Sequence, residues 1–156
     1  MIEGKLCTYR GPFENNKKHT NKEHPKGIMS YKDGPKYIGG WKDDKRDDDG
    51  NALLIFQDKN PVYQGNFKND KFHGEGAIQW SNNTWYKGQW KNGKKEGHGV
   101  MVYQNKMKYE GEFKNDERNG KGELIWNGSS TYKKYVGEFK DNKMHSKEEE
   151  SEENKG

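Results

Sequence analysis

Hydrophobic and polar residues alternate along most of this chain in short blocks that are separated by turn-forming residues. The block from Tyr63 to Trp80 has the sequence YQGNFKNDKFHGEGAIQW, and it returns after 23 residues as YKGQWKNGKKEGHGVMVY and after another 23 as YEGEFKNDERNGKGELIW. A fixed period of this length is typical of a repeat array. Each copy has two strand-like runs around a turn, so each copy predicts one β-hairpin.

Less regular copies extend the array in both directions. Upstream, one copy begins at Tyr37 and another at Tyr9, with extra residues near the turn of each, and a last, incomplete copy begins at Tyr135. We therefore expect five hairpins and one half hairpin over residues 1–147. The remaining residues, 148–156, have a different composition.

The turn of the central copy predicts the pairing of its strands. Asn92-Gly93 between strand-like flanks is a strong signal for a two-residue hairpin turn. In that case Lys91 lies opposite Lys94, and counting outward places Tyr86 opposite Gly99.

The same counting across the link to the next copy places Gly99 opposite Phe113. A large ring on one strand would then face a glycine on its neighbour, where two opposed rings would crowd. This explains the glycines as space for aromatic rings.

The period-two alternation puts the aromatic and aliphatic residues on one face of the sheet. The other face is mostly polar, as Gln64, Lys87 and Glu110 show. The apolar stripe is the candidate protein-binding surface, and it comprises Tyr63, Phe67, Ile78, Trp80, Tyr86, Trp90, Met101, Tyr103, Tyr109, Phe113, Leu124 and Trp126.

The spacing Y-x-G-x-[FW]-x-[ND]-[GD]-[KE]-x-x-G-x-G resembles the MORN repeat, over residues 9 to 145. The resemblance implies an all-β fold, in which consecutive hairpins form a single-layer antiparallel meander that twists into an elongated ribbon. The chain departs from the repeat at three places. An insertion near Lys18 predicts a distorted first turn, and Asp48-Asp49-Gly50 predicts a distorted second turn. Ser146 replaces a glycine of the last copy.

Composition agrees with a thin protein. Leu, Ile, Val and Phe number 20 of 156 residues, yet the net charge is only +4 and 13% of the residues are aromatic, which argues against disorder. The single cysteine, Cys7, excludes an internal disulfide. The first residues, MIEGKLCTYR, have no apolar run typical of a signal peptide, and no run reaches the length of a membrane span. We expect a soluble cytoplasmic protein.

Candidate catalytic and metal-binding chemistry is sparse. The five histidines are scattered and no constant ligand set recurs, so we expect neither a metal nor another cofactor. The glycine-rich strings lie inside hairpins and not at strand-to-helix junctions, which excludes phosphate-binding loops. We predict that the protein is not an enzyme and does not bind nucleic acid.

Lysines recur at the turns and form a basic edge about every 9–10 Å along the array. Such an edge meets anionic lipid headgroups or acidic protein tails, or it only solvates the sheet and blunts aggregation. Asp70, Asp116 and Glu117 dilute its field. The lysines are Lys68, Lys71, Lys91, Lys94, Lys114, Lys140 and Lys143.

Residues 148–156 carry five glutamates and one lysine. This composition is typical of a segment that is disordered, or that forms a helix on binding.

Three functions remain open. The first is a scaffold whose aromatic face binds other proteins, and the family resemblance suggests a cytoskeletal or ciliary assembly such as an axoneme or radial spoke head. The second is a phosphoinositide-binding or membrane-associated adaptor that uses the lysines. The third is a secreted carbohydrate-binding or choline-binding repeat, which the missing signal peptide disfavours.

Overall fold

The computed structural model describes residues 7–57, 61–80, 83–127 and 132–145. Its main sheet has twelve strands: β1 (Cys7–Arg10), β4 (Gly27–Tyr31), β5 (Lys36–Gly39), β8 (Asp48–Ile55), β9 (Val62–Lys68), β10 (Lys71–Gln79), β11 (Trp85–Lys91), β12 (Lys94–Val102), β13 (Lys108–Lys114), β14 (Glu117–Asn127), β15 (Tyr132–Lys140) and β16 (Lys143–His145). Two short pairs, β2 (Phe13–Glu14) with β3 (Lys17–Lys18) and β6 (Trp41–Lys42) with β7 (Lys45–Arg46), form the tips of the first two hairpins.

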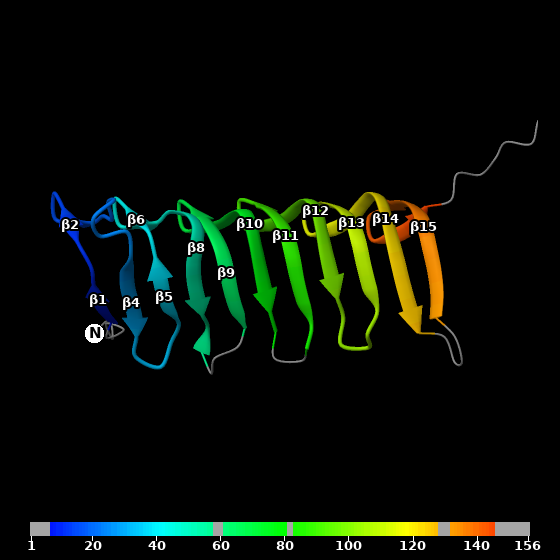
Figure 1. Cartoon of the computed structure of the whole chain (residues 1–156), viewed down its shortest axis with the longest axis horizontal. Helices are drawn as coiled ribbons and strands as arrows, with labels where there is room; N and C mark the ends of the chain where they lie inside the picture. The colour runs from blue at the N-terminus through cyan, green and yellow to red at the C-terminus, as the bar shows by residue number, and fades with distance from the viewer. Residues whose placement is uncertain (1–6, 58–60, 81–82, 128–131, 146–156) are drawn as a thin grey trace, which may run out of the picture.

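The strands pair antiparallel and in the order in which they occur in the chain, which confirms the predicted meander of hairpins. They stand side by side in one elongated row (Figure 1). All hairpin turns lie along one long side of this row, which we call the turn edge. The loops that join one hairpin to the next lie along the opposite side, the link edge.

Each turn has two central residues with positive φ, as a type I′ turn requires. Asn92 and Gly93 have φ of 53° and 86°, and Lys91 pairs with Lys94 as predicted. The first two turns, Asn15-Asn16 and Asp43-Asp44, have the same geometry. The expectation of distorted turns was therefore wrong, because the extra residues lie after the turns.

The predicted pairing beyond the turn was wrong by two residues. Two extra residues bulge out of β12, so that Gly88 pairs with Gly99 and Tyr86 with Met101. Phe113, in turn, pairs with Gly97 and not with Gly99. A shift of two residues keeps every side chain on its predicted face, because the side-chain period of a strand is two.

The glycines do make room for aromatic rings, although the rings reach them along the strand and not directly across it. A Cβ atom at Gly99 would lie 2.5 Å from Cε2 of Tyr86. The Tyr86 hydroxyl passes over the glycine and donates a hydrogen bond to the carbonyl oxygen of Gln89, at 2.9 Å. The corresponding tyrosines of the other hairpins bond three residues ahead in the same way: Tyr9, Tyr37, Tyr63, Tyr109 and Tyr135.

Burial raises the pKa of four of these tyrosines, Tyr37, Tyr63, Tyr86 and Tyr109. The pKa of Tyr109 rises to about 12, mainly through loss of hydration, while the nearby Arg118 guanidinium acts in the opposite direction. The same cause raises the pKa of Tyr37, Tyr63 and Tyr86. The hydroxyls therefore stay protonated in the folded state.

Replacing Gly99 with alanine is expected to lower the free energy of unfolding by about 2–3 kcal/mol, since the new methyl group overlaps the Tyr86 ring. Gly93→Asp is the matched control, because no atom lies within 4 Å of a Cβ at that position and Asp70 and Asp116 hold the same turn position with φ of 67° and 74°. Urea denaturation measures both. Equal losses in the two variants would contradict the proposed role of Gly99.

Stability is expected to fall above about pH 10, the ordinary pKa of tyrosine. The folded state keeps its raised-pKa tyrosines protonated, whereas the unfolded chain releases those protons. The tyrosine contribution is therefore complete below pH 10 and declines above it by about 1.4 kcal/mol per pH unit for each buried tyrosine. Urea denaturation between pH 8 and 12 measures the decline, and absorbance at 295 nm reports ionisation. A flat stability profile to pH 12 would disprove this coupling.

Candidate functional site

The structure divides the predicted apolar stripe into two parts. Nine of its twelve side chains are at most 8% exposed: Tyr63, Phe67, Ile78, Tyr86, Trp90, Met101, Tyr109, Phe113 and Leu124. Five residues outside the twelve candidate binding residues are buried with them: Met29, Tyr37, Trp41, Leu54 and Phe139. These side chains form the core on one face of the sheet, which we call the inner face; the opposite face is the outer face. A partner does not reach the core unless the hairpin tips open.

The other three members of the stripe, Trp80, Tyr103 and Trp126, are only partly buried and pack against the core. They stand at the link edge, where the second strand of each hairpin ends. Two further aromatic residues, Tyr31 and Phe56, hold the same place in the first two hairpins. The link edge of the inner face therefore carries a row of five aromatic residues, one for each complete hairpin.

The core rings touch one another in a continuous zigzag. Tyr86 contacts Trp90 of its own hairpin and Phe113 of the next, edge to face, at centroid distances of 5.1 and 5.2 Å. The same two contacts recur along the array, from Phe13 and Tyr9 to Phe139 and Tyr135. Each hairpin is thus joined to its neighbour by an aromatic pair.

A lysine or arginine at the second position after the turn places its charged group over most of these ring pairs. Lys95 Nζ lies 5.7 Å from the ring centroids of both Tyr86 and Phe113. Lys18, Arg46 and Arg118 occupy the same position in their hairpins. The sequence analysis missed this position, although a cation recurs there at a fixed distance from the turn. Burial lowers the pKa of Lys95, while Asp116 acts in the opposite direction.

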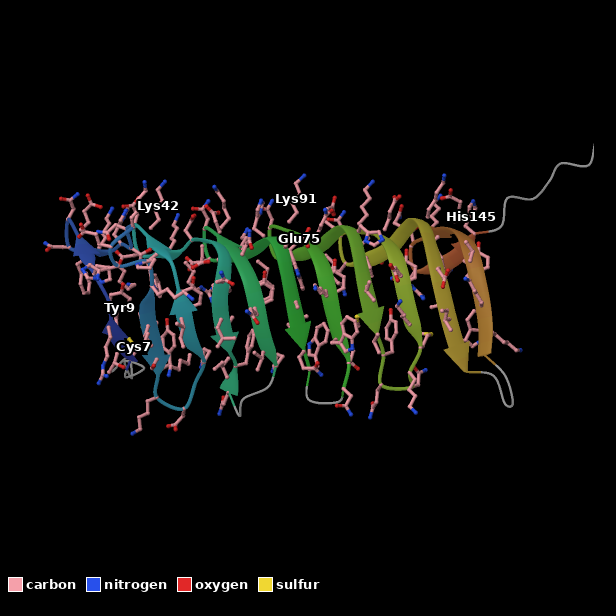
Figure 2. All side chains as sticks on the ribbon, in the orientation of Figure 1. Cys7, Tyr9, Lys42, Glu75, Lys91 and His145 are labelled. Atoms are coloured by element: carbon pink, nitrogen blue, oxygen red, sulfur yellow. The ribbon has the colours of Figure 1, made fainter. Side chains whose placement is uncertain are left out.

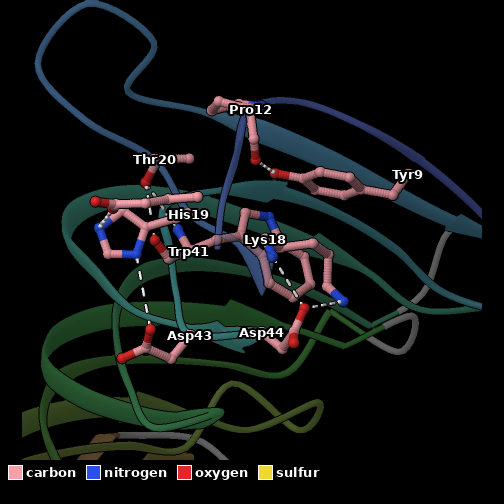
Figure 3. Close-up of polar contacts among 9 residues, drawn as sticks. Tyr9, Pro12, Lys18, His19, Thr20, Trp41, Asp43 and Asp44 are labelled. Carbon is pink, nitrogen blue, oxygen red and sulfur yellow. Dashed lines mark hydrogen bonds and ion pairs between the residues drawn. The ribbon is translucent and has the colours of Figure 1, made fainter. Parts of the chain in front are cut away.

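The turns themselves are linked by hydrogen bonds. The backbone N–H of Lys18 donates to Oδ1 of Asp44 in the next turn, at 2.9 Å, and the N–H of Asp44 donates back to the Lys18 carbonyl oxygen. The Lys18 ammonium also bonds to Asp44 and holds the pKa of that carboxyl below its usual range. Figure 3 shows this contact beside the bond between Thr20 and Trp41.

The same reciprocal pair of hydrogen bonds forms at four of the five junctions between neighbouring turns, and the junction at Phe72 is the exception. Here Phe72 replaces the cation and stacks on Tyr63 with centroids 3.8 Å apart. Gly93 has no side-chain oxygen, so only its backbone N–H bonds to the Phe72 carbonyl, at 2.8 Å. The junction in the middle of the array is therefore held by apolar contact, whereas the junctions on either side of it also use charged groups.

A groove lies on the inner face between the turn edge and the link edge, over the first three hairpins. Its volume is about 510 Å³. Met29, Tyr37 and Leu54 line it between the turn-edge residues Lys18 and Arg46, and it is closed at the link edge by Tyr31, Lys32, Gly34 and Pro35. Tyr31 is 38% exposed. The groove thus offers an apolar floor with cationic and anionic groups at its rim, since Asp44 and Asp70 also line it.

All seven predicted lysines of the turn edge are exposed. Figure 2 shows Lys42 and Lys91 projecting from this edge, and the equivalent Lys42 and Lys45 extend the predicted set to the second hairpin. Two acidic groups beside them bind the neighbouring turn: Asp70 accepts the backbone N–H of Arg46, and Asp116 accepts that of Lys95. Both aspartates are exposed, so acidic groups remain among the lysines of this edge.

The outer face is less polar than predicted over the first hairpins. Ile28, Ile38 and Leu53 lie side by side across three strands and are half-buried. Glutamates continue the same row toward the other end, at Glu110 and Glu123.

Among the described residues, His, Cys, Asp and Glu form no group of three or more that is suited to hold a metal ion. Within the same residues, no helix has the length and apolar character needed to cross a membrane.

Comparison with known proteins agrees with the geometry. No curated protein matches the chain. The family model described as MORN repeat matches residues 37–47, 63–85, 86–108, 109–131 and 135–147, which is more than half of the 156 residues. The hairpin at Tyr9 lies outside these matches, but it has the same tyrosine, the same two-residue turn and the same hydrogen bonds to the next turn. The chain therefore belongs to the MORN-repeat family.

Proposed function

We propose that this protein is a scaffold without enzymatic activity that binds an extended segment of another protein along the inner face. The observation that supports this most directly is the row of aromatic residues at the link edge, which continues the groove of the first hairpins. These rings are held in place by the core, yet they remain partly exposed. Aromatic side chains in this condition are typical anchors of protein interfaces.

The two borders of the inner face suit an extended chain. Successive hairpins are two strand spacings apart, or about 9–10 Å, so neighbouring rings would contact every third residue of an extended segment. The cations at the turn edge would face acidic or carbonyl groups on its other side. Within this proposal the protein is a cytoplasmic subunit of a cytoskeletal assembly, such as a ciliary axoneme, and the support for that placement is the family resemblance alone.

The proposal predicts that Trp80→Ala weakens partner binding by about 2 kcal/mol, because an anchor ring is lost at the link edge. Trp85→Ala is the matched control, since Trp85 also stands near the link edge but projects from the outer face. Peptides selected from a random display library on the full chain provide the ligands, and isothermal calorimetry provides their affinities.

Stability must be followed in parallel. Phe113→Ala is expected to lower the melting temperature strongly, since Phe113 is 4% exposed, and it should abolish binding as well. Tyr103→Ala should lower it much less while weakening binding. If Trp80→Ala and Trp85→Ala bind equally well, the inner face is not the binding surface.

A second function, contact with anionic lipid, is favoured by the exposed lysines at the turn edge. Vesicles with phosphatidylserine or phosphoinositide are expected to bind weakly, and the binding should disappear at high salt, because charges at the surface are screened within about 10 Å at 0.1 M salt. Lys91→Glu with Lys94→Glu should remove it, at about 1 kcal/mol for each lysine lost.

The control exchanges two lysines of the outer face, Lys87→Glu with Lys121→Glu, and leaves the turn edge intact. Vesicle sedimentation at two salt concentrations measures all variants. Submicromolar binding that survives high salt, or equal loss in both double variants, would contradict binding through the turn edge.

A further inference from the structure

Four of the junctions between hairpins place a cation over an aromatic ring pair, and at three of them a carboxylate lies beside the cation. Lys18 Nζ lies 2.8 Å from Oδ1 of Asp44, and Arg46 Nε lies 3.1 Å from Oδ1 of Asp70. Both aspartates are the second residue of the next turn. An aspartate holds the same turn position beside Lys95 and accepts the backbone N–H of that lysine at 2.9 Å.

Arg118 is the fourth of these cations, and the next turn offers it no carboxylate. Asn142 holds the position of the three aspartates. Its side-chain oxygen accepts the backbone N–H of Arg118 at 3.0 Å, and its carbonyl oxygen accepts Nη2 at 2.6 Å. Within the described residues, Arg118 has no ion pair. The acidic residues 148–156, which the sequence analysis expects to be disordered or to form a helix on binding, lie outside the described residues, as does Ser146.

The guanidinium of Arg118 therefore has donors without acceptors. Its Nε and Nη1 atoms have no hydrogen-bond partner and are shielded from solvent. Arg46, in contrast, donates from Nε to Asp70 at 3.1 Å. Donors of a charged group that are withheld from water and left unpaired lower stability, so an acceptor at this place is favourable.

These donors lie on the inner face, opposite the aromatic row of the link edge. The Cζ atom of Arg118 is 5.6 Å from the ring centroid of Tyr109 and 5.5 Å from that of Phe139. Its charge also acts on Tyr103: burial raises the pKa of the Tyr103 hydroxyl, and Arg118 acts in the opposite direction. Trp126 stands at the other end of the strand that carries Arg118. Arg118 as a whole is only half-buried, so its side chain is open to a ligand on this face.

We propose that the protein segment bound along the inner face carries a carboxylate that pairs with Arg118, an inference that rests on the function proposed above. Apolar residues of the segment, three positions apart, contact Tyr103 and Trp126, as the hairpin spacing of about 9–10 Å allows. One of the two residues between them faces the turn edge, and this residue is an aspartate or a glutamate. A carboxylate matches the guanidinium in charge and in the geometry of its donors.

The same pairing fixes where the segment lies along the array. The aromatic row alone offers a similar ring at every hairpin, so a segment could bind it in several registers. Lys18 and Arg46 are already neutralised by their own aspartates. The acidic residue therefore selects the hairpin of Arg118, where the cation still lacks a carboxylate.

Peptides selected from a random display library on the full chain test this pairing. They should share an aspartate or a glutamate between two apolar residues, and exchange of that residue for its amide should weaken binding by about tenfold or more. Arg118→Gln should weaken binding equally. The two changes together should weaken it no further, because a pair that has lost one partner retains no coupling. Lys121→Gln removes a charge from the outer face of the same hairpin and should leave the affinity unchanged; isothermal calorimetry measures all four.

Asn142→Asp tests the pairing from the opposite direction, because it supplies the missing carboxylate from within the chain. Asp44 and Asp70 have φ of 68° and 67° at this turn position, and Asn142 has 67°, so the backbone accepts an aspartate. The variant should raise the melting temperature and weaken binding of the acidic peptides by about tenfold. Asn92→Asp is the matched control, since it adds the same charge at another turn, where Asp43 shows that an aspartate fits.

The results that overturn the pairing differ from those that overturn inner-face binding. If Trp80→Ala weakens binding while Arg118→Gln does not, or if the selected peptides contain no acidic residue, the pairing is wrong and the proposed function stands. If Trp80→Ala and Trp85→Ala bind equally well, the proposed function fails, and the pairing fails with it. Equal weakening by Asn142→Asp and Asn92→Asp would show a general effect of charge and would also overturn the pairing.

Discussion

The structure depends on edge-to-face contact between aromatic rings in neighbouring hairpins. A single-layer sheet has no second layer to cover its apolar face, so the core must form from that face alone. Five tyrosines contact the Phe or Trp of the next hairpin at centroid distances from 4.9 to 5.7 Å, and the bent tips close over the pairs; they are Tyr9, Tyr37, Tyr63, Tyr86 and Tyr109. Such a pair contributes about 0.5–1.5 kcal/mol beyond the area that it buries. With only 20 Leu, Ile, Val and Phe residues, the chain has few other means of forming a core.

The glycines, the bulges and the cations are consequences of this contact. A ring that lies along the strand needs two neighbouring positions without side chains, which Gly88 and Gly99 provide beneath Tyr86. The bulge turns the tip onto the ring, and Gly97 takes its φ of 70° there. The cation at the tip then faces the electron-rich surface of the rings, where attraction is worth about 0.5–1 kcal/mol at partly exposed sites. At Phe72 a third ring takes the place of the cation, which keeps the same cover over Tyr63 without charge.

The sequence predicts the parts of this structure that depend on period and turn chemistry. The 23-residue repeat and Asn92-Gly93 are sufficient for the order of the strands, the turns and the division into two faces. The bulge could not be predicted by counting residues from the turn, because a pair of extra residues in a strand leaves the alternation of side chains between the two faces unchanged. Counting could not predict burial either, because alternating residues show the same pattern whether their face is exposed or covered. Phe113 is buried and Tyr103 only partly buried because the bent tips cover the first and not the second. The cation position is visible in the sequence, but its contact with two rings requires the bend.

The same contact makes the two ends of the array chemically different from its middle. Phe13 holds the position of Trp41, Phe67, Trp90, Phe113 and Phe139, yet it is 62% exposed while those five are at most 6% exposed, since no described strand precedes β1. At the other end Tyr135 covers Gly137 alone, where Tyr109 covers Gly111 and Gly122. A repeat array is stabilised by nearest-neighbour contacts, so the first and the last described hairpins each lack one contact that every inner hairpin has.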